Sequence, residues 1–438
     1  MILTSLKLNI ILLLISLIVG LSLGFTPVTL KLFGIDKVDI IAAHQTSEDI
    51  YHNFVFLYPN DQIQKHIVSN GIGTFMNVSY ANLFLRVSVD HSLMIIVSEQ
   101  CGNCGKNVLF NMSHSLTGDI YNFESDDCWS NLFAITSASY AKCEVQLNFG
   151  NRILLGLLGY DNIYLSAYSK SFPIENMIFI EQQDGITINE NLNGVMGIGR
   201  ADIDGTFGFS VYENFMSNGV IEGPMFSICI EPIGDGYIQF SAYGNGSYPV
   251  NEDEIVWFEQ EFPERYTIRT ERINFLEWEY IPKIKSVHLT FNTPYLLLPE
   301  PAFDGFYEQI KNGLCKSDNF PKICSNIDKL MKDGQPVGML FEELDLLEQL
   351  PVLTLELKGK QKKTLLIETK KYFGVCPELN KAYFYSGPGT EIQICSLVKI
   401  NRESTDPNQI MIGNIAHSTH GSLYIFNQRA GLVGIHKN

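Results

Sequence analysis

The chain has 438 residues, of which 45% are hydrophobic and 18% are charged. It is therefore long enough for two domains of ordinary size and too apolar for a disordered protein. Its formal net charge of −17 argues against nucleic acid as a partner, because phosphate binding needs a concentrated positive surface.

The N-terminus has the composition of a targeting segment. A short start with one lysine leads into the apolar run Leu8–Leu23, and Gly20 and Ser22 are small residues near a plausible cleavage point. We expect residues 1–24 to be a secretory signal peptide, so that the protein is secreted or lies in the lumen of the secretory pathway or lysosome. The alternative is an N-terminal membrane anchor that is not cleaved, because the run approaches the length that spans a bilayer.

The nine cysteines and three sequons fit an oxidising compartment. Most cysteines are expected in disulfides within two separate lobes, with one left over. Cys101 and Cys104 form a lone CxxC, which is too little for a zinc or redox motif, and we predict no metal site and no cofactor. Glycosylation is predicted at Asn77, Asn111 and Asn245.

Residues 25–79 lack a clear core pattern and are expected to be a pro-segment or an N-terminal extension. Many short strands and few short helices follow, which predicts an all-β fold. A stretch rich in Pro, Asp and Glu separates an N-terminal β lobe, residues 80–255, from a C-terminal β lobe, residues 256–438. The expected strands include 83–89, 93–97, 145–149, 163–166, 177–180, 226–230 and 237–241, and the expected helices are 209–218, 302–312 and 326–332.

Two features recur on either side of the expected boundary. An apolar pair followed by glycine occurs at Val195-Met196-Gly197 and again at Met411-Ile412-Gly413. An apolar strand that enters a turn occurs at Met94–Val97 and again at Val287–Thr290. The pattern indicates a weak internal duplication, in which each copy has a strand and turn with a second strand behind it.

Several stretches in order resemble the pepsin-like aspartic protease family, from about residue 80 to residue 438. The strongest are Gly194–Gly199, Phe226–Ile230, Pro299–Tyr307, and the C-terminal run from Met411 through Leu423–Asn427 to Gly431–Gly434. The resemblance implies a two-lobed pepsin-like fold with a cleft between the lobes. It also implies a monomer that binds an extended peptide or protein segment in that cleft.

The chemistry of this family needs one carboxylate from each lobe, in a loop of pattern Asp-Thr/Ser-Gly. Two such carboxylates lie so close that they share one proton, which lets one act as base and the other as acid. By resemblance, the first Asp position falls at Ser98, directly after an apolar strand, and the second falls at Thr290, or at Asn292 if the alignment slips by two residues. No Asp or Glu occurs between residues 279 and 300, so the second lobe lacks an acid here.

Two further residues complete the expected site. Glu99 is a possible substitute acid, one position from the expected one, and Phe149 stands where the family places the tyrosine of the flap hairpin. With both aspartates replaced, we expect a pseudoprotease with a peptide-binding cleft. The alternatives are an active aspartic endopeptidase with a displaced acid pair, and a glycosylated structural or surface protein on the same fold.

Overall fold

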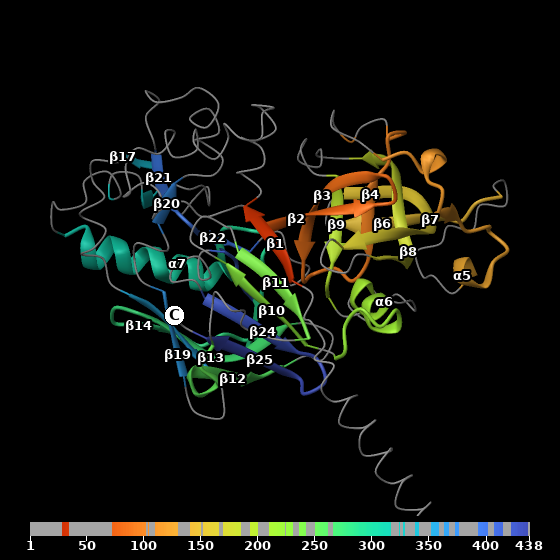
Figure 1. Cartoon of the computed structure of the whole chain (residues 1–438). Helices are drawn as coiled ribbons and strands as arrows, with labels where there is room; N and C mark the ends of the chain where they lie inside the picture. The colour runs from red at the N-terminus through yellow and green to blue at the C-terminus, as the bar shows by residue number, and fades with distance from the viewer. Residues whose placement is uncertain are drawn as a thin grey trace, which may run out of the picture.

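The computed structural model describes residues 29–34, 72–101, 104, 110–129, 141–149, 152–165, 170–184, 193–199, 210–223, 225–230, 236–241, 250–261, 266–316, 324, 327–328, 338–340, 352–358, 363–367, 373–375, 393–401, 407–414 and 422–436. The expected leader at residues 1–24 and the expected helix at 326–332, apart from residues 327 and 328, lie outside these ranges. Strands dominate the described chain, and the prediction of an all-β fold is confirmed (Figure 1). No helix within the described ranges is both long and apolar enough to cross a membrane.

The N-terminal half contributes the strands β1 (Thr29–Gly34), β2 (Ile72–Val78), β3 (Ala81–Ser88), β4 (Met94–Val97), β5 (Asp119–Ile120), β6 (Glu144–Phe149), β7 (Arg152–Leu165), β8 (Lys170–Asp184), β9 (Gly194–Gly197), β10 (Met225–Ile230) and β11 (Gly236–Phe240). The C-terminal half contributes β12 (Ile255–Glu259), β13 (Thr267–Phe275), β14 (Trp278–Tyr280), β15 (Ser286–Leu289), β16 (Leu296–Leu298), β17 (Gly338–Leu340), β18 (Leu353–Leu357), β19 (Lys363–Ile367), β20 (Phe373–Val375), β21 (Gln393–Ser396), β22 (Val398–Ile400), β23 (Ile410–Ile412), β24 (Ser422–Asn427) and β25 (Leu432–His436). The helical segments are η1 (Met112–His114), α5 (Asp126–Trp129), α6 (Val211–Ser217), η2 (Glu252–Glu254), α7 (Glu300–Gln309) and η3 (Ile310–Leu314).

The described strands form three sheets. The largest has the order β12-β25-β24-β10-β11-β1-β2-β3-β9-β4-β8-β7-β5, with β6 paired to β7. A second sheet has the order β19-β18-β13-β15-β23-β16-β22, with β14 paired to β13, and a small third sheet has the order β17-β21-β20. In Figure 1, strands β3 to β9 gather on one side of the molecule, while β10, β11, β24 and β25 lie nearer the centre.

Strand β1 connects two parts of the largest sheet. Its first residues pair with β11, from Thr29 opposite Gln239 to Leu32 opposite Gly236. Its last two residues pair with β2. The described parts of the segment 25–79 are therefore built into the sheet, although their sequence shows no clear core pattern.

Helix α6 begins where its sequence provides a capping box. The hydroxyl of Ser210 accepts a hydrogen bond from the backbone N–H of Glu213 at 3.1 Å, and the Glu213 carboxylate accepts one from the backbone N–H of Ser210 at 2.8 Å. Val211 and Phe215 are buried on the inner face of the helix. This short helix confirms the one expected at residues 209–218.

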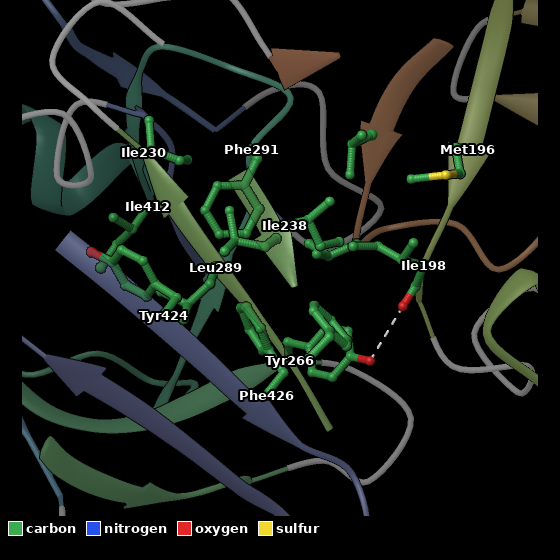
Figure 2. Packing of buried hydrophobic residues seen from close by; sticks show 14 of the residues in the cluster. Met196, Ile198, Ile230, Ile238, Tyr266, Leu289, Phe291, Ile412, Tyr424 and Phe426 are labelled. Atoms are coloured by element: carbon green, nitrogen blue, oxygen red, sulfur yellow. Dashed lines mark hydrogen bonds between the residues drawn. The ribbon is translucent and has the colours of Figure 1, made fainter. Parts of the chain in front are cut away.

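Aromatic side chains from both halves share the main core. Tyr266, before β13, packs against Phe426 of β24 with ring centroids 4.6 Å apart. Phe291, just after β15, packs edge-on against Tyr424. Figure 2 shows this group together with Ile198 of the N-terminal half, whose carbonyl accepts a hydrogen bond from the Tyr266 hydroxyl at 3.4 Å. The strand-to-turn segments of the two halves therefore rest on one apolar layer.

Among the cysteines that the structure describes, three disulfides lie within one half or the other: Cys101–Cys104, Cys128–Cys143 and Cys315–Cys324. They agree with the expectation of separate bridges in two lobes. The CxxC pair forms one of these disulfides.

Candidate functional site

The same arrangement of strands occurs in both halves. In the first half, β9 lies between β3 and β4, parallel to β3 and antiparallel to β4, and β8 runs parallel to β4. In the second half, β23 lies between β15 and β16 with the same directions, and β22 runs parallel to β16. Each half therefore contains one strand–loop–strand unit with a third strand inserted between its two arms. The duplication that the sequence indicates is present in the backbone.

The register of these strands matches the residues of one half to those of the other. Met196 of β9 lies opposite Val87 of β3, and Ile412 of β23 lies opposite Leu289 of β15. Met196 and Ile412 also pair with the first residues of the second arms, β4 and β16. Val87 and Leu289 therefore occupy equivalent positions, and the two loops that follow have the same length.

Four polar side chains follow at equivalent places in the two loops. Ser88 corresponds to Thr290, and two residues later Asp90 corresponds to Asn292. The backbone N–H of Asp90 donates to the Ser88 hydroxyl at 3.1 Å, and the backbone N–H of Asn292 donates to the Thr290 hydroxyl at 3.3 Å. Both loops thus begin with the same type of turn, in which a Ser or Thr hydroxyl accepts a hydrogen bond from the backbone N–H two residues later.

The glycine that ends each sequence repeat lets the loop pass close to the inserted strand. A Cβ atom on Gly197 would lie 2.5 Å from the carbonyl oxygen of Leu93, and one on Gly413 would lie 2.2 Å from that of Thr293. The backbone N–H of Gly197 donates to the Leu93 carbonyl at 3.0 Å. These two glycines are needed because backbone occupies the space where a side chain would begin.

The two loops meet at the carboxylate of Asp90. Its Oδ2 atom accepts hydrogen bonds from the Thr290 hydroxyl and from Nδ2 of Asn292, both at 2.6 Å. Its Oδ1 atom is hydrogen-bonded to Nε2 of His288. Nδ2 of Asn292 also donates to the Ser88 hydroxyl at 2.8 Å. One carboxylate from the first loop is thus held by three side chains of the second half, two from its loop and one from β15.

Burial and neighbouring groups set the charge state of Asp90. Its side chain is 20% exposed, and burial by itself raises the pKa. The charge and hydrogen bond of His288, the hydrogen bond of Thr290 and the charge of His91 lower it by more, and the resulting pKa is about 2. A second carboxylate sharing a proton with Asp90 would raise its pKa instead. Among the described residues, none of the side chains that donate to Asp90 is an Asp or a Glu.

The arrangement limits what the site can do chemically. The ionised Asp90 is a very weak base, and the hydroxyls of Ser88 and Thr290 do not act as acids near neutral pH. Ser88 and Thr290 are fully buried. Within the described chain no group of three or more His, Cys, Asp or Glu side chains is placed to hold a metal ion.

The structure brings Asp90, rather than Ser98, against Thr290. Ser98 lies at the end of β4, where its backbone N–H donates to the carbonyl of Ile180 and its hydroxyl accepts from the backbone N–H of Gln100 at 3.2 Å. Glu99, next to it, is exposed. The expectation paired Ser98 with Thr290 because it matched β4 to β15, whereas β4 pairs as β16 does and β3 pairs as β15 does.

The remaining predicted residues lie on other elements or outside the described chain. Phe149 ends β6, which forms the predicted hairpin with β7 and places Phe149 opposite Arg152. Asn77 is exposed on β2, and Asn111 caps η1 through its side chain. Asn245 lies outside the described residues.

Sequence reasoning missed Ser88 and Asp90. The signal was a second repeat, hydrophobic–hydroxyl–hydrophobic–Asp/Asn, which occurs as Val87–Asp90 and again as Leu289–Asn292. The next strand, β4 in the first half and β16 in the second, begins the same number of residues after each copy. The repeat is therefore visible when the two loops are aligned without a gap.

A protein built from two such halves, in which each supplies one loop to a shared central site, has the architecture of the two-lobed acid proteases. The family model of the eukaryotic aspartyl proteases matches residues 122–332, which include the second loop. Over these residues the chain is similar to the pepsin-like aspartyl proteases, and the resemblance seen in its sequence is confirmed there. No curated protein matches the chain significantly. Members of this family bind peptide substrates in a cleft.

Proposed function

We propose that this pepsin-like protein is a secreted pseudoprotease, which binds an extended peptide in its cleft but does not hydrolyse it. The observation that supports this most strongly is that Ser88 and Thr290 occupy equivalent positions in the two loops. On this reading the two hydroxyls stand at the family's two aspartate positions, with Ser88 rather than Ser98 in the first lobe. Asp90 and Asn292 then stand where the family has glycine.

The physical argument concerns proton transfer. The family's reaction needs one ionised and one protonated carboxyl on either side of a water molecule. Here the Asp90 carboxylate has a pKa of about 2, and both of its oxygens accept hydrogen bonds from side chains of the second half. No carboxyl group is among the described side chains that bind it. Disrupting a protease's catalytic unit lowers the rate by on the order of 10⁶ in the case of a serine protease triad.

The presence of Asp90 is also the one observation that favours the alternative, an active endopeptidase with a displaced acid. Its hydrogen bonds argue against that role, because a catalytic carboxylate must be able to take a proton from water. Peptide binding has no such requirement. Clefts of this kind hold extended peptides through backbone hydrogen bonds and alternating side-chain pockets.

The test is an assay of the purified protein with unfolded peptide substrates across pH 2–7, with and without pepstatin. We expect no cleavage that pepstatin inhibits. The variant D90N serves as the matched control, because cleavage that persists in D90N comes from a contaminating protease. Cleavage that pepstatin blocks and D90N abolishes would contradict the proposal. Capture of extended peptides by the same preparation, detected by mass spectrometry, tests the binding half of the proposal.

A further inference from the structure

Large apolar side chains are exposed around two of the three sequons. Tyr80 is 48% exposed, Leu116 is 97% exposed and Tyr164 is 38% exposed. These three residues, which we call the sequon patch, lie on the β2–β3 turn, the loop after η1, and strand β7. Exposed apolar side chains that form a contiguous patch often mark a site that another group covers.

The first sequon lies beside Tyr164. Asn77 of β2 is directly opposite Tyr164 of β7 on one side and Asn82 of β3 on the other. All three side chains are exposed on the same face of the sheet. Residues directly opposite each other in an antiparallel pair have Cβ atoms about 5 Å apart. A sugar attached to the Asn77 amide would therefore start within reach of the Tyr164 ring.

The second sequon is tied to the other two members of the patch. The Tyr80 hydroxyl accepts from the backbone N–H of Asn111 at 2.6 Å and donates to its carbonyl at 3.0 Å. The hydroxyls of Ser79 and Ser115 are 2.9 Å apart, which joins the β2–β3 turn to the loop that carries Leu116. A glycan on Asn111 would leave the surface next to Tyr80.

Leu116 is held in the open by its neighbours. The Ser115 hydroxyl accepts from the backbone N–H of Gly118 at 2.9 Å, and the Thr117 hydroxyl donates to the buried carboxylate of Asp161 at 2.6 Å. With both flanking residues fixed, the Leu116 side chain faces solvent. An exposed leucine side chain gains free energy when it is covered, which favours a cover over this position.

We propose that N-linked glycans on Asn77 and Asn111 cover the sequon patch, with their first sugars packed against Tyr164 and against Tyr80 and Leu116. The sugar rings offer C–H faces that suit an aromatic ring or an aliphatic side chain, while their hydroxyls stay in water. The occupant is thus the chain's own modification rather than a separate protein. This inference rests on the proposed passage through the secretory pathway.

The test uses the full chain expressed in a secreting eukaryotic cell. Peptide mapping by mass spectrometry should find glycans on Asn77 and Asn111. The variant N77Q/N111Q should bind a hydrophobic dye severalfold more strongly than the parent and should self-associate in gel filtration. N82Q is the matched control, since Asn82 lies on the same face of the sheet and is not in a sequon. Enzymatic removal of the glycans from the folded parent should give the same gain without any variant.

A second set of variants ties the gain to the patch. L116S and Y164T should abolish the extra dye binding of the glycan-free protein. I153T should leave it unchanged, because Ile153 is 40% exposed at the other end of β7 and has no sequon beside it. Secreted protein without glycans at these two asparagines, or glycan removal without a change in dye binding, would overturn the inference. Both outcomes are independent of the peptide cleavage assay, and secretion itself is read from the culture medium.

Discussion

Asp90 and Asn292, which occupy equivalent positions in the two loops, are hydrogen-bonded to each other across the halves of the molecule, with Nδ2 of Asn292 2.6 Å from Oδ2 of Asp90. Where two loops each bring a carboxylate to such a site, the two carboxylates share a proton. Here a carboxylate is hydrogen-bonded to an amide, a hydroxyl and an imidazole. The charge is therefore fixed, and the site holds the two loops together.

Replacing Asp90 tests how much this contact stabilises the protein. A pKa of about 2 in the folded state, against 3.8 in the unfolded state, corresponds to about 2 kcal/mol of stability above pH 4, which is lost as the pH falls towards 2. D90N should lower the free energy of unfolding at pH 7 by about this amount. Its stability should also change less between pH 4 and pH 2 than that of the parent. Urea unfolding at pH 7, 4 and 2.5 measures both effects, with D119N, at an exposed aspartate, as the control.

An added carboxylate distinguishes Ser88 from Ser98 as the neighbour of Asp90. S88D places a second acid beside Asp90 in a fully buried position, so it should raise the pKa of Asp90 and destabilise the protein by several kcal/mol at pH 7. S98D lies at the far end of β4 and should leave the titration of Asp90 unchanged. The pH dependence of urea unfolding compares the two. An equal effect of both variants would show that the topological match between the loops has no electrostatic consequence.

The two glycines that the loops pass should not tolerate a side chain. G197A and G413A would each bring a methyl group against a backbone carbonyl that cannot move far, at a cost of about 1–3 kcal/mol or more. G223A is the matched control, because a Cβ there meets nothing within 4 Å. It should be neutral, or stabilising by up to about 1 kcal/mol. Thermal unfolding of the three variants measures the difference, and a neutral G413A would contradict the close approach.

Strand β1 should stay bound after the chain is cut behind it. It pairs with β11 and with β2, so its hydrogen bonds do not depend on the connection through residues 35–71. A protease site engineered near residue 50 should yield two fragments that migrate together in gel filtration and separate only in denaturant. Release of the N-terminal fragment under native conditions would show that β1 is a dispensable extension.

The sequence predicts the fold more completely than the site. The apolar runs around Leu83–Val97 and the two apolar–apolar–Gly segments are clear local signals. The structure places the two glycine-ended segments at equivalent strands, β9 and β23. β1 was not predicted, because Thr29–Gly34 mixes polar and apolar residues and is defined by its partners far along the chain. The proposed first acid position, Ser88, differs from the predicted Ser98 for a related reason. Met94–Val97 looks like the strand before a loop, and only the pairing with β9 shows that it is the strand after one.

The charge state of Asp90 could not be predicted from the sequence at all. It depends on His288, Thr290 and Asn292, which lie about 200 residues away and are brought together only by the packing of the two halves. A search for acids at Ser98 and Thr290 finds none and passes over Asp90, which precedes Ser98 on the other side of β4. Comparing the two loops with each other, rather than each with a family pattern, would have revealed it.

The account depends on Asp90 being a single ionised carboxylate, and a carbon-13 NMR titration of the aspartate carboxyl groups measures this most directly. D90N identifies the Asp90 signal by its loss. We predict one titration step, with a midpoint near pH 2. Two coupled steps, with the upper one above pH 4, would reveal a second acid that shares a proton with Asp90 and would contradict the account.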